Sequence, residues 1–349
     1  VPTVLYWDGG DLTGSSNATN GNGGSGIWNS NNGNWTSAPA FSANFAWGSQ
    51  TGVFAGAAGG TVQVSGTQAF QELRFETSGY NLNPADGTGR LATTGGFSII
   101  DVSSAAGSAG LNLGISGTGG LTKTGAGTLI LANSNTYSGS TTVSAGTLRL
   151  STVGTLASAV QNNASFVNEG IIAGAVTNSG TLNSTGSLNG GLTNNAGATA
   201  SLAGLVNGAV TNAGAITLTG TTTGIGALNQ ASTGTLNLNG FASTIGSLAG
   251  AGTIQLGSSV ITVGGNNAST SFTGVMSGLG GINKTGTGTF TLTGVNTYTG
   301  STTVSGGQLN LVAGASLAGP LSNSVVVVNE GSISGIITNS GTLTSTGRL

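Results

Sequence analysis

The chain has 349 residues, of which 67 are glycine, only 4% are charged, and none is cysteine or histidine. This composition excludes disulfide scaffolds, catalytic triads or dyads that use histidine or cysteine, and metal sites with histidine ligands. Six Lys and Arg residues with a net charge of -2 are too few for phosphate recognition, so we expect no nucleic-acid partner. Hydrophobic residues make up 37% of the chain. They are spread through it without the run of roughly 20 that a spanning helix needs, which favours a secreted β-rich protein.

The N-terminal segment differs from the rest of the chain because it holds all four tryptophans, Trp7, Trp28, Trp35 and Trp47. A solenoid needs an atypical segment over its first coil, since an open sheet edge invites aggregation. We therefore predict an aromatic-rich N-terminal cap at residues 1–60, followed by a β-helix at residues 61–349. The alternative is that these aromatics form a platform for sugars.

The ionisable residues early in the chain favour structural roles. Asp8 and Asp11 lie in a Gly-rich turn and are expected to be solvated carboxylates, with weak Ca²⁺ binding as the alternative. Glu72, Arg74 and Glu76 alternate as on one face of a strand, where opposite charges pair locally. A glycosidase carboxylate pair is the less favoured interpretation of these residues. We expect no catalytic, cofactor or metal site.

Short alternating segments fill the remainder, such as residues 181–185, 215–219 and 235–239. Alternation of period two, punctuated by Asn-Gly and Ser-Gly, predicts strands joined by tight turns. Thr-Asn pairs at residues 177–178, 193–194 and 211–212 recur at steps of 16 and 18 residues, and a period near 18 is typical of one solenoid coil with about three short strands. We predict an all-β chain, at least roughly 40% strand and nearly free of α-helix, folded as a right-handed parallel β-helix.

Asn178, Asn194 and Asn212 recur at nearly equal steps along the chain. Neighbouring coils stack about 4.8 Å apart. A charge repeated on every coil would therefore form a repulsive ladder, at a cost on the order of 1 kcal/mol for each contact. Thr and Asn can instead hydrogen-bond along the stack. We expect the three asparagines in stacked turns, with aliphatic residues facing inward and Thr, Ser and Asn facing outward.

A duplication relates two long segments at a constant offset of 161 in the numbering. Residues 119–150 match residues 280–311 without a gap. We assign the duplicated units to residues 98–258 and, in part, 259–349, so that the second copy is cut within its unit. A solenoid cut there exposes a sheet edge, and we expect further units, or a second molecule stacked head to tail, to cover it.

Both copies contain the pattern K-x-G-x-G-x-L-x-L followed by N-T-Y-x-G-x-T. This pattern resembles the passenger-associated transport repeat of bacterial autotransporters. The matching residues at the core of the pattern are Lys123, Gly125, Gly127, Asn135, Thr136, Tyr137 and Gly139, and Lys284, Gly286, Gly288, Asn296, Thr297, Tyr298 and Gly300. The resemblance implies that these residues serve export or folding of a secreted β-helical passenger. It also implies a Gram-negative bacterium whose outer membrane holds a translocator barrel for the passenger.

We therefore predict a non-enzymatic secreted or cell-surface fibre or adhesin that acts in attachment, aggregation or biofilm formation, with no cofactor. Two alternatives stay open: a polysaccharide-active β-helix enzyme, and an inert spacer that displays another domain. The expected partners are further copies of the chain, the translocator barrel, and a host or matrix glycan. Self-association, head to tail or lateral, is favoured because so little charge opposes it.

Overall fold

The structure is a computed structural model that describes residues 3–11, 21–37, 43–105, 107–220 and 224–349. The chain divides into two compact units, Val1–Gly174 and Ala175–Leu349. Within the described ranges the regular structure is all β-strand with no α-helix, and the strands exceed the expected share of roughly 40%. No helix in these ranges is long and apolar enough to cross a membrane.

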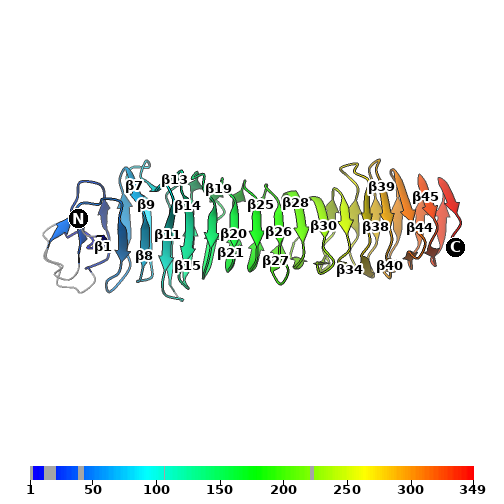
Figure 1. Cartoon of the computed structure of the whole chain (residues 1–349), viewed down its shortest axis with the longest axis horizontal. Helices are drawn as coiled ribbons and strands as arrows, with labels where there is room; N and C mark the ends of the chain where they lie inside the picture. The colour runs from blue at the N-terminus through cyan, green and yellow to red at the C-terminus, as the bar shows by residue number, and fades with distance from the viewer. Residues whose placement is uncertain (1–2, 12–20, 38–42, 106, 221–223) are drawn as a thin grey trace. The chain divides into compact units, whose positions relative to one another are not determined.

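In the first unit, most coils contribute one strand to each of three parallel columns, whose strands lie side by side in Figure 1. The first column contains β2 (Gly26–Trp28), β6 (Thr61–Val64), β9 (Tyr80–Pro84), β12 (Ser108–Leu111), β15 (Thr128–Leu131), β18 (Thr147–Leu150) and β21 (Ser165–Asn168). The second contains β1 (Val4–Trp7), β5 (Thr51–Phe54), β8 (Glu72–Phe75), β11 (Phe97–Val102), β14 (Gly120–Thr124), β17 (Thr141–Val143) and β20 (Val160–Asn162). The third contains β7 (Thr67–Phe70), β10 (Arg90–Thr93), β13 (Ile115–Gly117), β16 (Ser134–Asn135), β19 (Thr155–Leu156) and β22 (Ile171–Ile172). The short strands β3 (Trp35–Thr36) and β4 (Asn44–Phe45) pair antiparallel beside β1.

The second unit has the same three-column construction, and two of its strands are long enough to belong to two columns. One column contains β23 (Val176–Asn178), β26 (Leu192–Asn194), β28 (Val206–Asn212), β30 (Ile225–Gln230), β33 (Leu248–Gly250), β36 (Thr270–Phe272), β39 (Thr289–Leu292), β42 (Gln308–Leu311), β45 (Val326–Asn329) and β48 (Thr342–Ser345). Another contains β25 (Ser187–Leu188), β28, β30, β32 (Ser243–Ile245), β35 (Ile261–Val263), β38 (Ile282–Lys284), β41 (Thr302–Val304), β44 (Leu321–Asn323) and β47 (Ile337–Asn339). The third contains β24 (Thr181–Ser184), β27 (Thr199–Leu202), β29 (Ala215–Leu218), β31 (Thr235–Asn237), β34 (Thr253–Gly257), β37 (Val275–Gly278), β40 (Val295–Asn296), β43 (Ser316–Leu317) and β46 (Ser332–Ile333).

The expected parallel β-helix is confirmed, but its coils are less uniform than the sequence predicted. Leu91 pairs with Ile115 on the next coil, and Val176 pairs with Leu192, so the first of these coils is half as long again as the second. Strands as well as loops differ in length between these coils, since β11 has six residues and β25 has two, while the inward-facing residues stay in register. The expected coil period therefore holds for some coils and is wrong for the longer ones.

The stacked asparagines are confirmed, but the expectation that they face outward is wrong. Asn178, Asn194 and Asn212 are fully buried at the ends of their strands. The Nδ2 of Asn178 donates to Oδ1 of Asn194 at 2.8 Å, and Nδ2 of Asn194 donates to Oδ1 of Asn212 at 2.9 Å. Asn212 continues the series to Oε1 of Gln230 at 2.8 Å. Burial is tolerated because each amide is bonded to the next coil, so that the ladder needs no water.

The tryptophans form a buried aromatic cluster within the predicted N-terminal cap and not a surface platform. Trp7, Trp28 and Trp35 are 0% exposed, and Trp47 is 7% exposed. Trp35 packs edge-on against both Trp7 and Trp28, with ring centroids 5.2 Å apart in each pair. The sugar-platform alternative is therefore wrong, because a platform must present ring faces to solvent. Residues 12–20 and 38–42 of the predicted cap lie outside the described residues, and the assigned bounds of cap, β-helix and duplicated units stay predictions.

Candidate functional site

The first transport-type motif places a lysine ammonium in the interior. Lys123 lies in β14, where alternation turns its side chain inward, and it is 0% exposed. Its Nζ donates to three backbone carbonyls: that of Thr124, that of Gly125 at 2.9 Å, and that of Ala145 at 3.2 Å. Ala145 belongs to the following coil, so the ammonium joins two coils. All three ammonium hydrogens are used, which offsets the cost of burying the charge.

The second motif repeats this arrangement. Lys284 ends β38 and is 1% exposed. Its Nζ donates to the carbonyls of Thr285 at 2.6 Å, Gly286 at 3.1 Å and Gly306 at 3.0 Å. Each acceptor is the sequence equivalent, at the offset of 161, of an acceptor in the first copy. Burial lowers the pKa of Lys284, because removal from water disfavours the ammonium.

The two lysines differ in their electrostatic surroundings. Burial lowers the pKa of Lys123 to about 8, and the carboxylate of Asp101 acts in the opposite direction. Asp101 pairs in register with Thr124, whose Oγ1 donates to its Oδ2 at 2.9 Å. Lys284 has Thr262 at the position equivalent to Asp101. Asp101 was missed from the sequence because it lies a full coil before the lysine; counting one coil back would have found it.

The motif glycines are needed for backbone shape and close approach. Gly125 and Gly286 have φ values of +71° and +66°, which side-chain-bearing residues rarely adopt. This turn aims the carbonyls of the glycine and its predecessor at the ammonium. At Gly127 and at Gly288 a Cβ would lie 2.4 Å from a backbone carbonyl oxygen of the preceding coil. Larger residues at these positions would hold the coils apart.

The motif asparagines use their side chains to bond backbone groups of the coil stack. Oδ1 of Asn135 accepts from the backbone N–H of Ile115 at 3.1 Å, and its Nδ2 donates to the carbonyl of Asn133 at 2.8 Å. In the second copy, Oδ1 of Asn296 accepts from the N–H of Met276 at 3.0 Å. Both asparagines are 1% exposed. The bonds from Oδ1 reach the preceding coil, so the asparagines join coils much as the lysines do.

The motif tyrosines are buried, and each bonds within its own repeat. The hydroxyl of Tyr137 shares a hydrogen bond of 2.6 Å with Oγ1 of Thr141, and that of Tyr298 one of 2.5 Å with Oγ1 of Thr302. Burial raises the pKa of Tyr137 to about 12 and raises that of Tyr298 as well. Both phenols are neutral at physiological pH, which suits a structural hydrogen bond.

The remaining motif residues are a threonine that faces solvent and a glycine that lies against the preceding coil. Thr136 and Thr297 are exposed, and their backbone N–H groups continue the sheet to the preceding coil. At Gly139 and at Gly300 a Cβ would lie 2.4 Å from a backbone atom of that coil. The predicted motif residues therefore act inside the coil stack or in its backbone, and only the two threonine side chains face solvent.

The other sequence candidates have structural roles. Asp8 is 1% exposed, so the expectation of a solvated carboxylate is wrong there; its Oδ1 accepts from the N–H of Asn22 at 2.7 Å. Among the described residues, no three acids gather as metal ligands would. The predicted local pairing of Glu72 and Arg74 is confirmed at 2.7 Å, and it raises the pKa of Arg74. Glu76 lies just beyond β8 and is exposed.

Comparisons with known proteins agree with the motif geometry. The family model described as passenger-associated-transport-repeat matches residues 121–150 and 282–311. The chain is also 33% identical over 273 residues to the adhesin BmaC autotransporter of Brucella suis biovar 1 (strain 1330). The chain belongs to the autotransporter passengers. As such a passenger, it is secreted or displayed on the surface of a Gram-negative bacterium.

The alignment with the adhesin covers the two proteins to very different extents. The alignment covers 74% of the chain but only 6% of the adhesin. The chain thus spans a small part of the relative's length. No solved structure matches the passenger.

Proposed function

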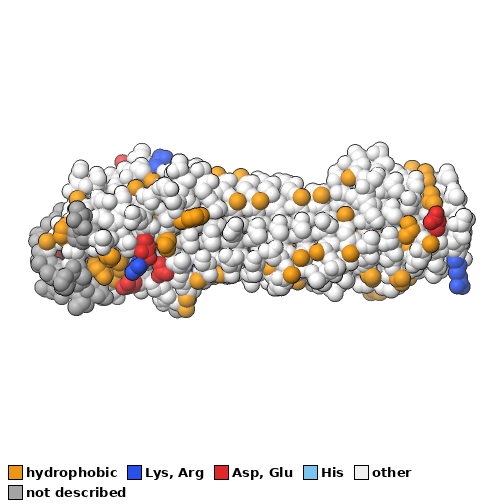
Figure 2. Space-filling view, viewed as in Figure 1, with side chains coloured by type: hydrophobic (Ala, Val, Ile, Leu, Met, Phe, Trp, Pro, Cys, Tyr) orange, Lys and Arg blue, Asp and Glu red, His pale blue; other side chains and the backbone are white. Residues whose placement is uncertain are grey.

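We propose that this passenger is a non-enzymatic adhesin, which presents a β-helical surface for attachment and, through it, for aggregation or biofilm formation. The observation that carries the proposal is the identity of 33%, over 74% of the chain, to a protein named an adhesin. The surface supports it: Figure 2 shows a face on which uncharged atoms dominate and charged side chains gather in few places. Hydroxyl and amide groups on such a face can make many weak hydrogen bonds to a polar partner.

The transport repeats support a role in folding and export. Because their lysines, asparagines and tyrosines are buried, they are not available to a ligand. They would instead lock successive coils as the passenger folds outside the cell, with the translocator barrel as the export partner. Replacing both Lys123 and Lys284 with Ala should lower the amount of passenger displayed on cells and leave any hydrolytic activity unchanged. Normal display together with loss of an activity would contradict this role.

Self-association is the second kind of partner that the surface supports. Val153, Leu279 and Ile336 are 70%, 74% and 80% exposed. Apolar side chains with little surrounding charge favour lateral contact between copies. Sedimentation of the purified chain at rising concentration should show association that Val153→Ser, Leu279→Ser and Ile336→Ser together reduce. A strictly monomeric chain at every concentration would contradict lateral packing.

The adhesive function is tested with beads that carry the purified chain. Native beads should attach saturably to host cells or extracellular-matrix coatings, soluble chain should compete, and beads with heat-unfolded chain should not attach. The chain should release no reducing sugar from polysaccharides. Release of reducing sugar would favour the enzyme alternative, and attachment no better than that of unfolded chain would favour the inert spacer.

A further inference from the structure

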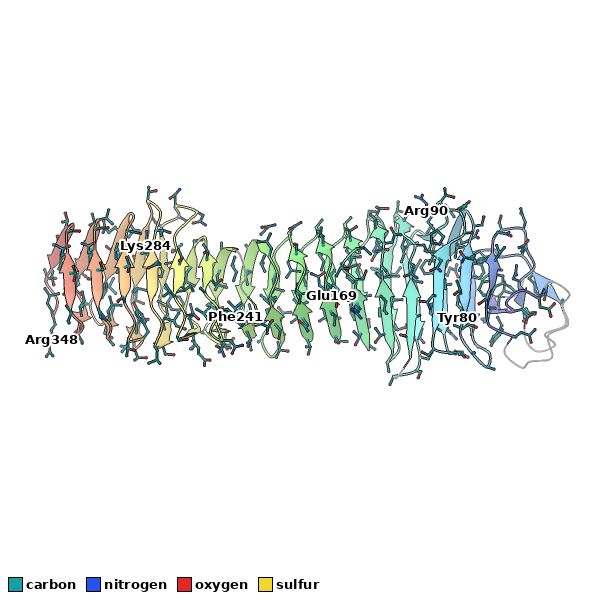
Figure 3. All side chains as sticks on the ribbon, turned by 180° about the vertical axis from the view of Figure 1, so that it is seen from behind. Tyr80, Arg90, Glu169, Phe241, Lys284 and Arg348 are labelled. Atoms are coloured by element: carbon teal, nitrogen blue, oxygen red, sulfur yellow. The ribbon has the colours of Figure 1, made fainter. Side chains whose placement is uncertain are left out.

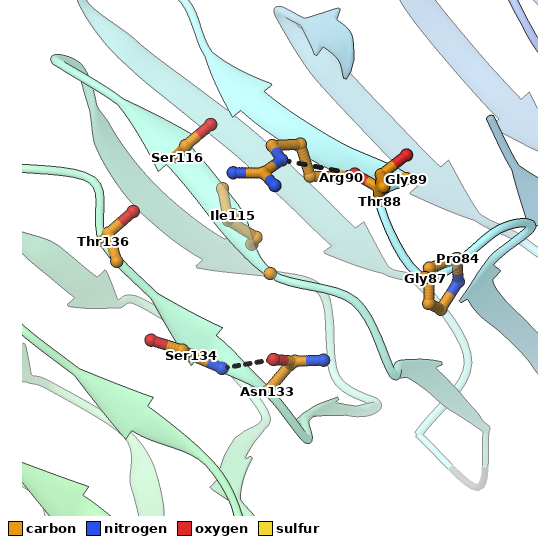
Figure 4. Close-up of a pocket in the computed structure, with 11 residues that line it drawn as sticks. Pro84, Gly87, Thr88, Gly89, Arg90, Ile115, Ser116, Asn133, Ser134 and Thr136 are labelled. Atoms are coloured by element: carbon orange, nitrogen blue, oxygen red, sulfur yellow. Dashed lines mark hydrogen bonds between the residues drawn. The ribbon is translucent and has the colours of Figure 1, made fainter. Parts of the chain in front are cut away.

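A polar hollow opens on the outer surface of the first unit, beside the first transport repeat. It has a volume of about 240 Å³. Its walls come from the loop before β10, from β13 and from the segment around β16. Figure 4 shows polar side chains from these elements around the hollow, and those that the argument uses are Thr88, Arg90, Ser116, Asn133, Ser134 and Thr136.

Arg90 is the cation of this hollow, and it lies at the outer edge of its coil (Figure 3). Its Nε donates to the carbonyl of Thr88 at 3.3 Å, the bond drawn in Figure 4. Among the described residues, no carboxylate oxygen lies within 4.0 Å of a guanidinium nitrogen of Arg90. Arg74 and Arg149, by contrast, each form an ion pair with a glutamate. The two terminal nitrogens of Arg90 therefore remain available to an anion from solution. An arginine held in this way matches a carboxylate with two parallel hydrogen bonds.

The loop that holds Arg90 is fixed before any ligand arrives. Oδ1 of Asp86 accepts from the N–H of Thr88 at 2.9 Å, from its Oγ1 at 2.7 Å and from the N–H of Gly89 at 3.1 Å. Gly89 lies so close to the preceding coil that a Cβ would come within 1.8 Å of the carbonyl oxygen of Val64. The carbonyl that orients the guanidinium is thus itself held in place, which lowers the entropy cost of binding.

Hydroxyl and amide groups complete the wall opposite the cation. Oγ of Ser116 donates to the carbonyl of Leu91 at 3.2 Å, so its lone pairs can accept from a ligand. Oγ of Ser134 accepts from Oγ1 of Thr155 at 3.2 Å, so its own hydrogen can be donated. Thr136 is exposed beside them. Such an alternation of donors and acceptors suits the hydroxyls of a sugar.

The second copy lacks this constellation although it shares the fold. Leu91 pairs with Ile115 as Ile254 pairs with Met276, so Thr253 occupies the position of Arg90. At the offset of 161, Gly294 replaces Asn133 and Val295 replaces Ser134. The cation, the amide and one hydroxyl are therefore special to the first copy and are not required by the coil.

We propose that the Arg90 hollow binds the carboxylate-bearing unit of an acidic saccharide, an inference that rests on the adhesive function proposed above. The guanidinium takes the carboxylate, and Ser116, Ser134 and Thr136 bond the ring hydroxyls. The volume of about 240 Å³ lies below the roughly 300–1,000 Å³ of pockets for drug-sized ligands, which suits a single sugar unit. A single cation suits one carboxylate better than a polyphosphate, which needs several cations.

The test uses the whole purified chain and calorimetric titration with four probes: digalacturonate, its methyl ester, sialyllactose and lactose. We expect at least one of the two acidic saccharides to bind and both neutral probes to fail. Binding of one acid alone identifies a uronic or a sialic acid as the source of the carboxylate. Arg90→Gln should weaken the binding at least tenfold, whereas Arg348→Gln, a matched change of an exposed arginine in the other unit, should leave it unchanged.

Three outcomes would overturn the inference: no acidic saccharide binds, the methyl ester binds as well as the acid, or Arg90→Gln binds as well as the unmodified chain. Circular dichroism of Arg90→Gln should match the unmodified chain, since the side chain is exposed and its bond to Thr88 stays within its own loop. Beads that attach to cells while no acidic saccharide binds would leave the adhesive function standing and remove only this site. Saccharide binding without any attachment would remove the adhesive function instead.

Discussion

The two transport repeats, residues 121–150 and 282–311, are alike inside and different outside. In both, a buried lysine donates to three carbonyls, a buried asparagine bonds the preceding coil and a buried tyrosine bonds a threonine. On the surface, Ser134 and Arg149 of the first copy are replaced by Val295 and Asn310 in the second. The comparison indicates that coil stacking constrains the interior, while the outer face is free to acquire a binding site.

The physical reason for this difference is that a substitution costs more free energy in the interior than on the surface. A buried ammonium or amide that loses its partners keeps an unsatisfied polar group, at about 1–3 kcal/mol for each. An exposed side chain that is replaced can exchange its partner for water at little cost. Interior changes should therefore be severe in both repeats, and surface changes mild.

The largest effect is expected from adding a methyl group between coils. Gly139→Ala and Gly300→Ala each place a Cβ 2.4 Å from a backbone atom of the preceding coil, so the coils must separate. We expect each to lower the local unfolding free energy by about 3 kcal/mol. Gly95→Ala and Gly265→Ala are the matched controls, because nothing lies within 4 Å of either added Cβ. Hydrogen exchange should show reduced protection of the neighbouring backbone amides in Gly139→Ala and Gly300→Ala, and unchanged protection in the two controls.

A loss of protection at one repeat and not at the other would break the comparison. It would mean that one copy tolerates coil separation, and that the shared motif does not have the same structural role in both units. Equal losses in the control variants would show that any alanine in these loops disturbs the stack.

A smaller effect is expected from the motif tyrosines. Tyr137→Phe and Tyr298→Phe each remove one buried hydrogen bond, at about 1–2 kcal/mol. Tyr298→Phe should cost more, because Thr141 retains a contact to Ser158 at 3.2 Å, while the Thr302 hydroxyl has no second partner among the described residues. Midpoints of urea unfolding, followed by far-ultraviolet circular dichroism, should show this order.

These tyrosines also predict how stability depends on pH. The pKa of Tyr137 is raised from 10.0 to about 12 in the fold, so the folded state retains a proton that the unfolded chain loses. Its contribution is fully present below pH 10 and is lost as the pH rises through 12. The urea concentration at the unfolding midpoint should therefore decrease as the pH rises from 10 to 12. The variant with both Tyr137→Phe and Tyr298→Phe should show a smaller decrease. An equal slope in that variant would contradict the buried phenols.

The sequence predicted much of the fold because alternation and repetition are local signals. Period two and the coil spacing indicated parallel strands, and the offset of 161 indicated that Lys123 and Lys284 are equivalent. The burial of Asn194 was predicted wrongly, because its polarity suggests solvent, whereas the neighbouring coils supply the partners of its amide. Arg90 and Ser134 were not recognised as neighbours, since loops of unequal length decide which residues of successive coils meet.

The smallest effect is expected at the surface ion pair. Arg149 bonds Glu169 at 2.9 Å, with side chains that are 46% and 24% exposed. Arg149→Asn copies the residue of the second repeat, Asn310, and should cost less than about 1 kcal/mol because solvent screens the pair. At low salt the urea midpoint of the variant should lie below that of the unmodified chain. At high salt the two midpoints should be equal. A large loss that salt does not reduce would show that this surface position is as constrained as the interior.

The most direct measurement of the central claim is hydrogen exchange on the whole chain with Lys123→Met, Lys284→Met and both together. Each change leaves three carbonyls without the ammonium, so amide protection in the affected repeat should fall on the order of a hundredfold. The account predicts losses of similar size in residues 141–150 for the first variant and 302–311 for the second, each confined to its own unit. Unchanged protection in either repeat would contradict the claim that the two lysines are equivalent, inward-facing locks between coils.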